Sequence, residues 1–404
     1  MKHMNKEPLL FLCHRIPFPP NKGDKIRSFH ILKELSHRYD IHLGTLVDDP
    51  NDWQYADVLK QYSCDQLVRP LRPLWGKLKG LLGMLLGKPI SLTYFHDSQL
   101  QRWVDHKIKA EGIQKVFLYS SAMCRYVEKQ PGLHRVADFV DVDSDKWRQY
   151  AEKATNPLMK AVYTYEANTL ACYEQKITRD FDAVSFVSSE EAAFFAKPLA
   201  AELAAKVFAF PNGVDTAFFT PAAAGQSPFT QPYLVFTGAM DYWANVDAVV
   251  WFVKHVWPGI RKQHADLQFA IVGGNPTEKV WQLAEVDGVV VTGRVEDIRA
   301  YIAHATFAVA PLRIARGIQN KVLEAMAMGK SVVMTQMAAE GINLPPSQLP
   351  MVHDEADDFM RCCLQLIANP HTGSQIGQEN LHWIGAHYQW QAVMDKLVGK
   401  LNHD

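Results

Sequence analysis

The alternation of strand and helix patterns constrains the fold more than any other feature of this chain. Short runs of buried residues alternate with longer amphipathic patterns along nearly the whole sequence. The chain opens with a strand pattern over 9–13, a proline-rich turn over 16–20, a helix pattern over 25–39 and a second strand pattern over 41–47. Further along, the longest helix pattern runs over 147–181, and a strand pattern over 233–237 opens the second half. Such alternation predicts parallel strands joined by crossover helices. We therefore expect an α/β protein built from doubly wound parallel sheets.

The pattern is interrupted once, by a short proline-punctuated stretch that reads TPAAAGQSPFTQP. A chain of 404 residues has room for about two domains. We predict a Rossmann-like domain over 1–215, a linker over 216–232 and a second Rossmann-like domain over 233–380. A C-terminal helix within 381–404 is expected to pack back toward the N-terminal domain. Parallel sheets bind ligands at the carboxyl ends of their strands, so we expect the two domains to face each other across a cleft.

Composition excludes several classes of protein. A net charge of −1 gives no global attraction to nucleic acid, and no nucleic acid partner is expected. The apolar run near the N-terminus is too short for a signal peptide, and no stretch approaches the ~18 apolar residues of a membrane span. The six cysteines form no CxxC pair and the 16 histidines no HExxH motif. We predict a reduced, cytoplasmic protein without a metal site.

One strand–turn–helix segment concentrates groups suited to an anion. A strand pattern leads into a turn that carries Arg316 and Gly317, and a helix pattern follows over 318–328. Lys321 and Glu324 fall on the same helical face as Gly317. Backbone N–H groups at a helix start and a lysine suit a phosphate, and a carboxylate suits hydroxyls.

Glycines end several predicted strands. Gly238, Gly273 and Gly293 each follow a strand pattern of the second domain, and Gly23 follows the first strand of the chain. Backbone crowding around a bound ligand would require glycine at such ends. Ordinary β-to-α turns also use glycine, and at Gly23 a simple turn with a helix cap is an open alternative.

Several motifs resemble those of a known family. The chain resembles the retaining GT-B glycosyltransferases of family 4 in FPNGVD (210–215), VGG (272–274), VTGRVEDI (291–298) and the element from Gly317 through Lys321 and Glu324 to AMAMG. It resembles, more finely, the sugar transferases of exosortase (PEP-CTERM) and exopolysaccharide loci in GDKIRS (23–28), FVDVDSDKW (139–147) and FTGAMDYWANVDAV (236–249). The resemblance covers nearly the whole chain and is strongest over 210–341.

The resemblance implies a nucleotide-diphosphate-sugar co-substrate, held mainly by the second domain, without an obligatory cofactor. Glu324 would bind the ribose hydroxyls, and Gly317 with the next two N–H groups would hold the diphosphate. The other implied donor-binding positions are Gly23, Gly238, Arg294, Val295, Asp297, Arg316, Ile318, Gln319 and Lys321. Among them, 294–297 would face the base, and Gly23 would approach the donor phosphate.

Three departures from the family pattern bear on the chemistry. Arg316 stands where the family often has a second glutamate, and 239–246 lacks the usual arginine and lysine. The run Leu-Tyr-Ser-Ser at 118–121 lacks a histidine that the family often carries. A diphosphate still needs compensating charge, for which Lys321, Arg316 and Arg313 are the nearest candidates.

Acidic residues alternate in RVADFVDVDSDKW, after a strand pattern. They could polarise an acceptor hydroxyl or a developing positive charge, hold a divalent cation, or cap the next helix. We assign acceptor-side chemistry to Asp141 and Asp143, and catalytic roles to Lys321 and Glu324 on the donor side.

The segment 69–88 carries five cations, no acid and many apolar residues. A basic amphipathic segment of this kind can lie in a membrane interface, and the alternative is a helix with solvated lysines. The membrane reading suits a peripheral protein of the inner leaflet that acts on a lipid-linked acceptor.

The sequence as a whole favours a retaining hexosyltransferase-type enzyme that moves a sugar from a nucleotide-diphosphate sugar to a glycan or lipid-linked glycan, in exopolysaccharide biosynthesis. Two alternatives stay open: a catalytically silent GT-B protein that binds glycans or scaffolds an assembly, and a GT-B nucleotide-sugar epimerase.

Overall fold

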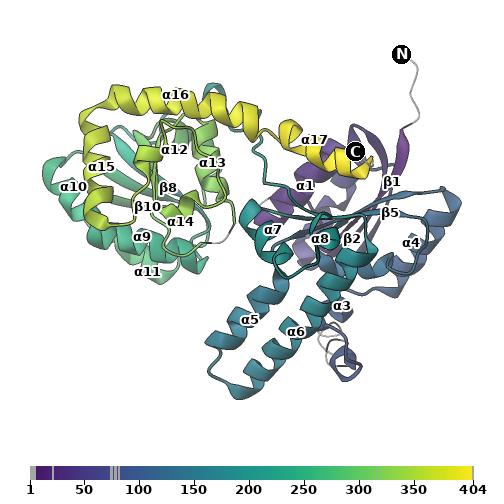
Figure 1. Cartoon of the computed structure of the whole chain (residues 1–404). Helices are drawn as coiled ribbons and strands as arrows, with labels where there is room; N and C mark the ends of the chain where they lie inside the picture. Colours follow the sequence, from purple (N-terminus) through teal and green to yellow (C-terminus); the bar gives the residue numbers. More distant parts are fainter. Residues whose placement is uncertain are drawn as a thin grey trace, which may run out of the picture. The chain divides into compact units, whose positions relative to one another are not determined.

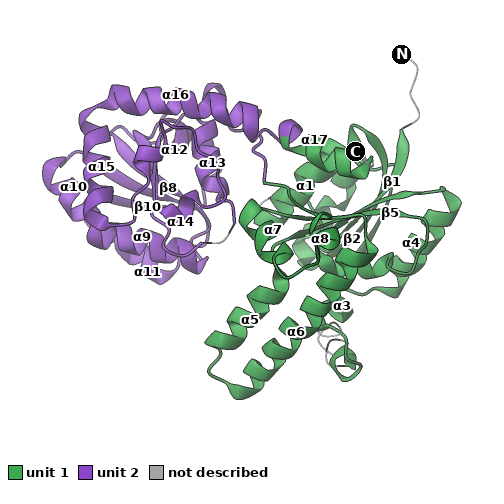
Figure 2. Ribbon diagram, viewed as in Figure 1, with its two compact units in different colours: residues 1–211, 393–404 green, residues 212–392 purple. Residues whose placement is uncertain are grey.

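The chain folds into two compact units. The computed structural model describes residues 6–20, 22–72, 76, 80, 82–315 and 317–402. Unit 1 comprises Met1–Pro211 and Val393–Asp404, and unit 2 comprises Asn212–Ala392 (Figure 2). The proline-punctuated stretch 216–232 therefore belongs to unit 2.

Unit 1 is built on a seven-stranded, wholly parallel sheet of order β3-β2-β1-β4-β5-β6-β7 (Figure 1). Its strands are β1 (Glu7–Cys13), β2 (Tyr39–Val47), β3 (Asp65–Pro70), β4 (Lys115–Tyr119), β5 (His134–Val140), β6 (Ala183–Phe186) and β7 (Val207–Ala209). The order reverses between β1 and β4, which makes their carboxyl ends the topological switch point of the sheet. Residues 9–13 of β1 are fully buried, as a strand covered by helices on both faces requires.

The described helical segments of unit 1 connect these strands. They are α1 (Gly23–Ser36), η1 (Pro50–Gln61), α3 (Ile90–Tyr94), α4 (Ser98–Ala110), η2 (Ser121–Tyr126), α5 (Asp143–Lys153), α6 (Pro157–Asp180), α7 (Ser189–Ala196) and α8 (Ala201–Ala204). The terminal helix α17 (Trp390–Leu401) belongs to unit 1 from Val393 onward. The Lys400 carbonyl lies 2.6 Å from Nε2 of His134, and the Tyr39 hydroxyl donates to Asn402 at 2.9 Å.

The prediction of one long helix over 147–181 is wrong, because the chain breaks at 154–156. The structure has two helices there, α5 and α6, which lie side by side as a hairpin (Figure 1). Pro157 opens α6, and the Asn156 side chain accepts the backbone N–H groups of Leu158 and Met159. Asn-Pro is a helix-start signal because the proline needs no N–H acceptor and the asparagine caps the first turn.

Unit 2 is built on a five-stranded parallel sheet of order β10-β9-β8-β11-β12. Its strands are β8 (Tyr233–Thr237), β9 (Gln268–Val272), β10 (Val289–Gly293), β11 (Phe307–Ala310) and β12 (Val332–Met334). Its helical segments within the described chain are η3 (Pro221–Ala223), α9 (Trp243–His255), α10 (Trp257–Gln263), α11 (Glu278–Trp281), η4 (Gln282–Glu285), α12 (Ile298–Ala303), α13 (Asn320–Ala327), α14 (Gln336–Ala339), η5 (Leu349–Met351), α15 (Ala356–Ala368) and α16 (Pro370–His387). Here the order reverses between β8 and β11. The predicted fold class, two Rossmann-like parallel-sheet domains, is confirmed.

No helix in the described part of the chain has both the length and the apolar character needed to cross a bilayer. All six cysteines are free, and four of them are buried.

Candidate functional site

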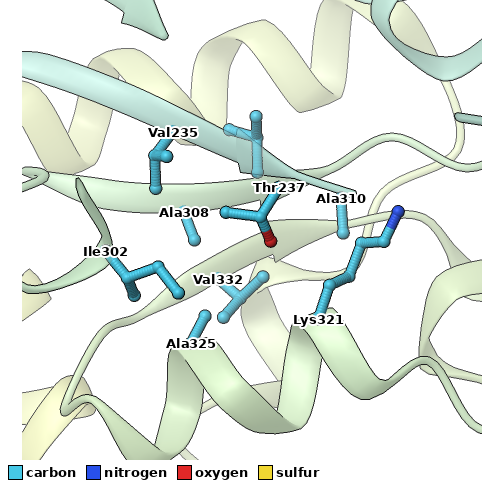
Figure 3. Close-up of a pocket in the computed structure, with 9 residues that line it drawn as sticks. Val235, Thr237, Ile302, Ala308, Ala310, Lys321, Ala325 and Val332 are labelled. Atoms are coloured by element: carbon cyan, nitrogen blue, oxygen red, sulfur yellow. The ribbon is translucent and has the colours of Figure 1, made fainter. Parts of the chain in front are cut away.

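Lys321 lies at the switch point of the unit 2 sheet. It extends from α13 past Ala310, toward the carboxyl end of β8 (Figure 3). Its ammonium donates a hydrogen bond to Oδ1 of Asn245 on α9 and lies 4.2 Å from the centroid of the Phe236 ring. It forms no ion pair within the described chain. An unpaired ammonium therefore stands where parallel sheets bind their ligands.

The backbone at this point admits no side chains. A Cβ on Gly238 would lie 2.7 Å from Nδ2 of Asn245 and 3.1 Å from Nζ of Lys321. A Cβ on Gly273 would lie 1.7 Å from the Gly238 carbonyl oxygen. Both glycines also have positive φ angles, of 155° and 154°. These glycines are therefore needed partly because the ends of β8 and β9 lie so close to each other. Close approach of a ligand is not the sole reason for glycine here.

Burial shifts the pKa values of Lys321 and Glu324 toward each other. Desolvation lowers the pKa of Lys321 to about 7, with the Glu324 charge opposing the shift. Desolvation likewise raises the pKa of Glu324 to about 7, with the Lys321 charge opposing it. The Glu324 carboxylate has no hydrogen-bond partner within the described residues. The two groups are thus poorly solvated and available to a polar ligand.

The start of α13 differs from the expected one. The helix begins at Asn320, so Gly317 precedes it and does not share a helical face with Lys321. Gly317 adopts a φ of 63°, and its carbonyl accepts a hydrogen bond from Nε2 of Gln319 at 3.0 Å. Ile318 is buried. At the start of α13, the N–H groups of Val322 and Leu323 both donate to the Gln319 carbonyl, at 3.0 and 3.4 Å. The positive end of the helix dipole lies at this start, next to Lys321.

The two predicted arginines of the turn cannot be treated alike. Arg313 forms a bidentate ion pair with Asp247 of α9, at 2.7 and 3.1 Å. Its charge is therefore already compensated. Arg316 lies outside the described residues, and its role stays a prediction.

Two of the side chains expected to face the base, within 294–297, already have contacts inside unit 2. Asp297 caps α12 by accepting the Arg299 N–H at 2.9 Å, and it also holds the Arg299 guanidinium at 2.7–3.0 Å. Val295 packs against the core of unit 2. Arg294 is exposed, with its side-chain carbons near Gly274. Of the predicted set, Arg294 is the side chain available to a ligand.

In unit 1, Asp138 belongs to a buried structural network. Its carboxylate pairs with Arg27 at 2.7 and 3.2 Å and accepts the Ser185 hydroxyl at 2.9 Å. Arg27 also donates to the Phe210 carbonyl at 2.7 Å. Because Asp138 is fully buried and Arg27 is 1% exposed, this pair holds α1 to the sheet and offers nothing to a ligand.

Asp141 and Asp143 follow a strained strand end. Val140 closes β5 with a φ of 71°, an unusual conformation for a β-branched residue. Burial raises the pKa of Asp143 to about 6, and the neighbouring Asp141 charge adds to the shift. The capping alternative does not apply to Asp143, because the N-cap of α5 is Val142 and the Ser144 N–H donates to Glu174 of α6 at 3.3 Å. Asp143 therefore stays available for chemistry.

A histidine that sequence reasoning missed lies at the switch point of unit 1. His14 follows β1, and its ring stacks on Tyr119 of β4 at 5.8 Å between centroids. Its Nε2 lies 3.9 Å from the Asp24 carboxylate, and desolvation lowers the pKa of His14 to about 4. The pairing of β1 with β4 aligns Cys13 with Tyr119 and so places His14 beside the run 118–121. This is the run in which the family often carries a histidine and this chain does not. Gly23, the first residue of α1, has no atom within 4 Å of its would-be Cβ, so this helix start is open.

The basic segment 69–88 lies in part outside the described residues, namely at 73–75, 77–79 and 81. Its described end, 82–88, is held to α6 because the Tyr165 hydroxyl donates to the Met84 and Lys88 carbonyls at 3.0 and 3.2 Å. Leu82, Leu85 and Leu86 are 54%, 80% and 72% exposed.

No group of three or more histidine, cysteine or acidic side chains within the described chain could hold a metal ion. Each unit thus carries its own candidate groups. Unit 2 has the Lys321 ammonium, the Glu324 carboxylate and the start of α13. Unit 1 has Asp141, Asp143 and His14.

Comparison with known proteins agrees with this geometry. Residues 231–369 match the model of a family described as glycosyl transferases group 1. No curated protein matches the chain in sequence. The chain is similar in structure to Anabaena HepE in complex with UDP and glucose, at 12% identity over 98% of this chain and 100% of that one, with a TM-score of 0.64.

Two further structures show the same likeness. WaaG, a glycosyltransferase involved in lipopolysaccharide biosynthesis, is 13% identical over 98% of this chain and 100% of its own, with a TM-score of 0.62. A mutant of S. aureus TarM, in complex with Fondaparinux, alpha-GlcNAc-glycerol and UDP, is 11% identical over 98% and 100%, with a TM-score of 0.61. Likeness at such identities shows the fold, which is GT-B. The family match supports the group 1 glycosyltransferases, and the finer exosortase-associated branch stays a prediction.

Proposed function

We propose that this chain is a glycosyltransferase that moves a sugar from a nucleotide-diphosphate sugar to a glycan or lipid-linked glycan acceptor, with retention at the transferred carbon. The observation that carries the proposal is Lys321, an ammonium without an ion pair among the described residues, at the switch point of unit 2 beside the first turn of α13. The group 1 family match over 231–369 supports it independently. UDP and glucose bound to HepE make UDP-glucose a suitable first probe for the donor.

The donor side has to stabilise the departing diphosphate. Charge develops on the phosphate oxygen as the bond to the sugar breaks, and a poorly solvated ammonium stabilises that charge more than an ammonium in water does. The first-turn N–H groups of α13 add to the positive potential. Glu324, one helical turn along from Lys321, accepts hydrogen bonds from ribose hydroxyls. This chemistry uses the chain's own groups, and no metal is obligatory in the proposal.

The acceptor side has to orient a hydroxyl and take its proton. Asp141 and Asp143 follow the strained Val140, and we assign that role to them. The burial that raises the pKa of Asp143 to about 6 suits a group that exchanges protons near neutral pH. His14 is kept neutral at pH 7 by burial, so it can hydrogen-bond an uncharged hydroxyl without adding charge.

We also propose that the segment 69–88 rests on an anionic membrane surface, which would bring a cytoplasmic enzyme to a lipid-linked acceptor of exopolysaccharide synthesis. The exposed leucines of 82–86 supply the apolar contact, and the cations of the segment supply the attraction.

Replacement of Glu324 tests the donor site. Glu324→Gln and Lys321→Ala are each expected to abolish transfer while the melting temperature without ligand is retained within a few degrees. Glu355→Ala is the matched control, because Glu355 is an exposed glutamate of unit 2 that makes no side-chain cap. Full activity in both site variants would contradict the assignment.

A thermal-shift panel of UDP, GDP, ADP and dTDP sugars separates the alternatives. A ligand at 100 times its Kd adds about 2.7 kcal/mol of stability. A stabilising nucleotide sugar followed by transfer supports the proposal. No stabilisation by any nucleotide favours the silent scaffold, and an epimeric product from donor alone favours the epimerase.

A further inference from the structure

A second hollow opens beside the donor edge of unit 2. It has a volume of about 460 Å³. It lies at the carboxyl ends of β11 and β12, whereas the Lys321 site lies between β8 and β11. Both sites therefore adjoin the loop that leads from β11 to α13, and the groove is within the roughly 300–1,000 Å³ typical of small-molecule sites.

The walls of this groove are held in place by hydrogen bonds. Thr335 donates its hydroxyl to the Leu312 carbonyl at 2.5 Å and so joins the ends of β12 and β11. The same oxygen accepts the Ala338 N–H at 3.3 Å, which fixes the start of α14. Asp354 accepts the Gln336 N–H at 2.8 Å from the other side. The groove is thus formed before any ligand arrives.

Two polar side chains on its rim have no partner within the described residues. The Gln336 amide and the Glu340 carboxylate have no side-chain hydrogen bond within the described residues. Arg313 also lines the groove, but its charge is compensated by Asp247. Glu340 and Asp354 are both acidic, so the described residues that line the groove carry net negative charge and disfavour an anion.

The floor is apolar. Leu312 is almost fully buried there, and Met337 presents a 36% exposed side chain. An apolar face beside carboxylate and amide groups matches a sugar ring, which has an apolar face of C–H groups and an edge of hydroxyl donors. A carboxylate accepts such donors through charge-assisted hydrogen bonds.

We propose that this groove is a sugar subsite of unit 2 that binds an uncharged, hydroxyl-rich ring through Glu340, Gln336 and the Met337 face. The ring has two possible sources, the sugar of the donor or a unit of the acceptor glycan, and the first source rests on the proposed function. The acidic rim selects against sugars that carry a carboxylate or a phosphate.

The methyl group of Met337 reports occupancy without any need for catalysis. The full chain is labelled with ¹³C at its methionine methyls, and the Met337 signal is assigned with Met337→Leu. UDP, UDP-glucose and a neutral gluco-oligosaccharide are titrated in separate arms, and the same arms are repeated with the GDP and dTDP pairs. Met360, which packs against Gly259 away from the groove, is the internal control.

A shift of the Met337 signal with a nucleotide sugar but not with its nucleotide assigns the groove to the donor's sugar. A shift with the oligosaccharide alone assigns it to the acceptor. In either case Glu340→Ala is expected to weaken the binding of that ligand about tenfold or more, whereas Glu355→Ala leaves it unchanged. If the groove holds the donor's sugar, UDP-glucuronate is also expected to bind less tightly than UDP-glucose.

A Met337 signal that no sugar ligand moves, or equal affinities in the Glu340→Ala and Glu355→Ala variants, would overturn the subsite. Failure of the proposed function looks different. In that case no nucleotide stabilises the protein, while the oligosaccharide arm still decides whether the groove binds a sugar.

Discussion

Replacement of Lys321 by methionine should raise the free energy of unfolding and lower the affinity of the proposed donor site for a nucleotide diphosphate. The ammonium is held in a poorly solvated place, where burial lowers its pKa from 10.5 to about 7. At about 1.4 kcal/mol for each pH unit, keeping this lysine charged costs the fold a few kcal/mol. A methionine side chain would fill the same space without that cost, but it would leave the Asn245 oxygen unpaired, which costs about 1–3 kcal/mol. We expect Lys321→Met to be as stable as the wild type at pH 7, or more stable by about 1–3 kcal/mol.

The binding of nucleotide diphosphate should fall at the same time. A charge-assisted hydrogen bond to phosphate contributes about 1.5–3 kcal/mol, so the Kd of UDP should rise about 10- to 100-fold. At a UDP concentration 100 times the wild-type Kd, ligand stabilisation would drop from about 2.7 kcal/mol to about 0.4–1.4 kcal/mol. Differential scanning calorimetry of both proteins, with and without UDP, measures both effects in one experiment.

The burial of Lys321 and Glu324 also predicts how the free energy of unfolding changes with pH. The folded lysine has a pKa of about 7, so between pH 7 and 10.5 the unfolded chain binds more protons and stability rises with pH. The folded Glu324 also has a pKa of about 7, so between pH 4.5 and 7 the folded state binds more protons and stability falls as pH rises. Lys321→Met should remove the rise above pH 7. A variant that loses more than about 2 kcal/mol of stability, or that keeps its affinity for UDP, would refute the reasoning.

Three further changes have expected outcomes. Val140→Gly should relieve the strain of its positive φ and raise the free energy of unfolding, measured in urea, by about 1 kcal/mol. Sugar transfer should slow in an activity assay, because the acids that follow Val140 would be held less firmly. Gly273→Ala should destabilise unit 2 by more than about 2 kcal/mol, because its Cβ would lie 1.7 Å from a carbonyl oxygen, whereas Gly274→Ala, with 3.8 Å to its nearest neighbour, should be nearly neutral in thermal melts. Asp138→Asn should cost unit 1 about 3–5 kcal/mol in urea unfolding, since it breaks a buried pair with Arg27, and equal stability would show that the pair is not structural.

The fold followed from the sequence because hydrophobic periodicity is a local signal. Strand patterns at 9–13, 41–47 and 233–237 reappear as β1, β2 and β8 with ends within a few residues. The mistake over 147–181 has a local cause as well. Apolar periodicity continues across 154–156, and only the Asn-Pro pair marks the break between α5 and α6.

Much of the candidate site depends on contacts that no local pattern encodes. His14 became a candidate only because β1 pairs with β4 and stacks it on Tyr119. Asp138 and Asp143 look alike in the sequence, five residues apart, yet one is bound to Arg27 and the other is held by burial at a pKa of about 6. Which carboxylate is structural depends on residues far away in the chain.

The compensation of phosphate charge shows the same dependence on distant residues. Spacing alone makes Arg313 and Lys321 equivalent, since both lie near the turn after β11. Asp247 of α9 takes the Arg313 charge, while Asn245, two residues earlier on that helix, offers Lys321 only a neutral oxygen. Because an amide is neutral, the charge of Lys321 is opposed only by that of Glu324 among the groups that shift its pKa, and it stays available to the diphosphate of the proposed donor. One helix therefore decides which of the two cations serves the fold and which is left for a ligand.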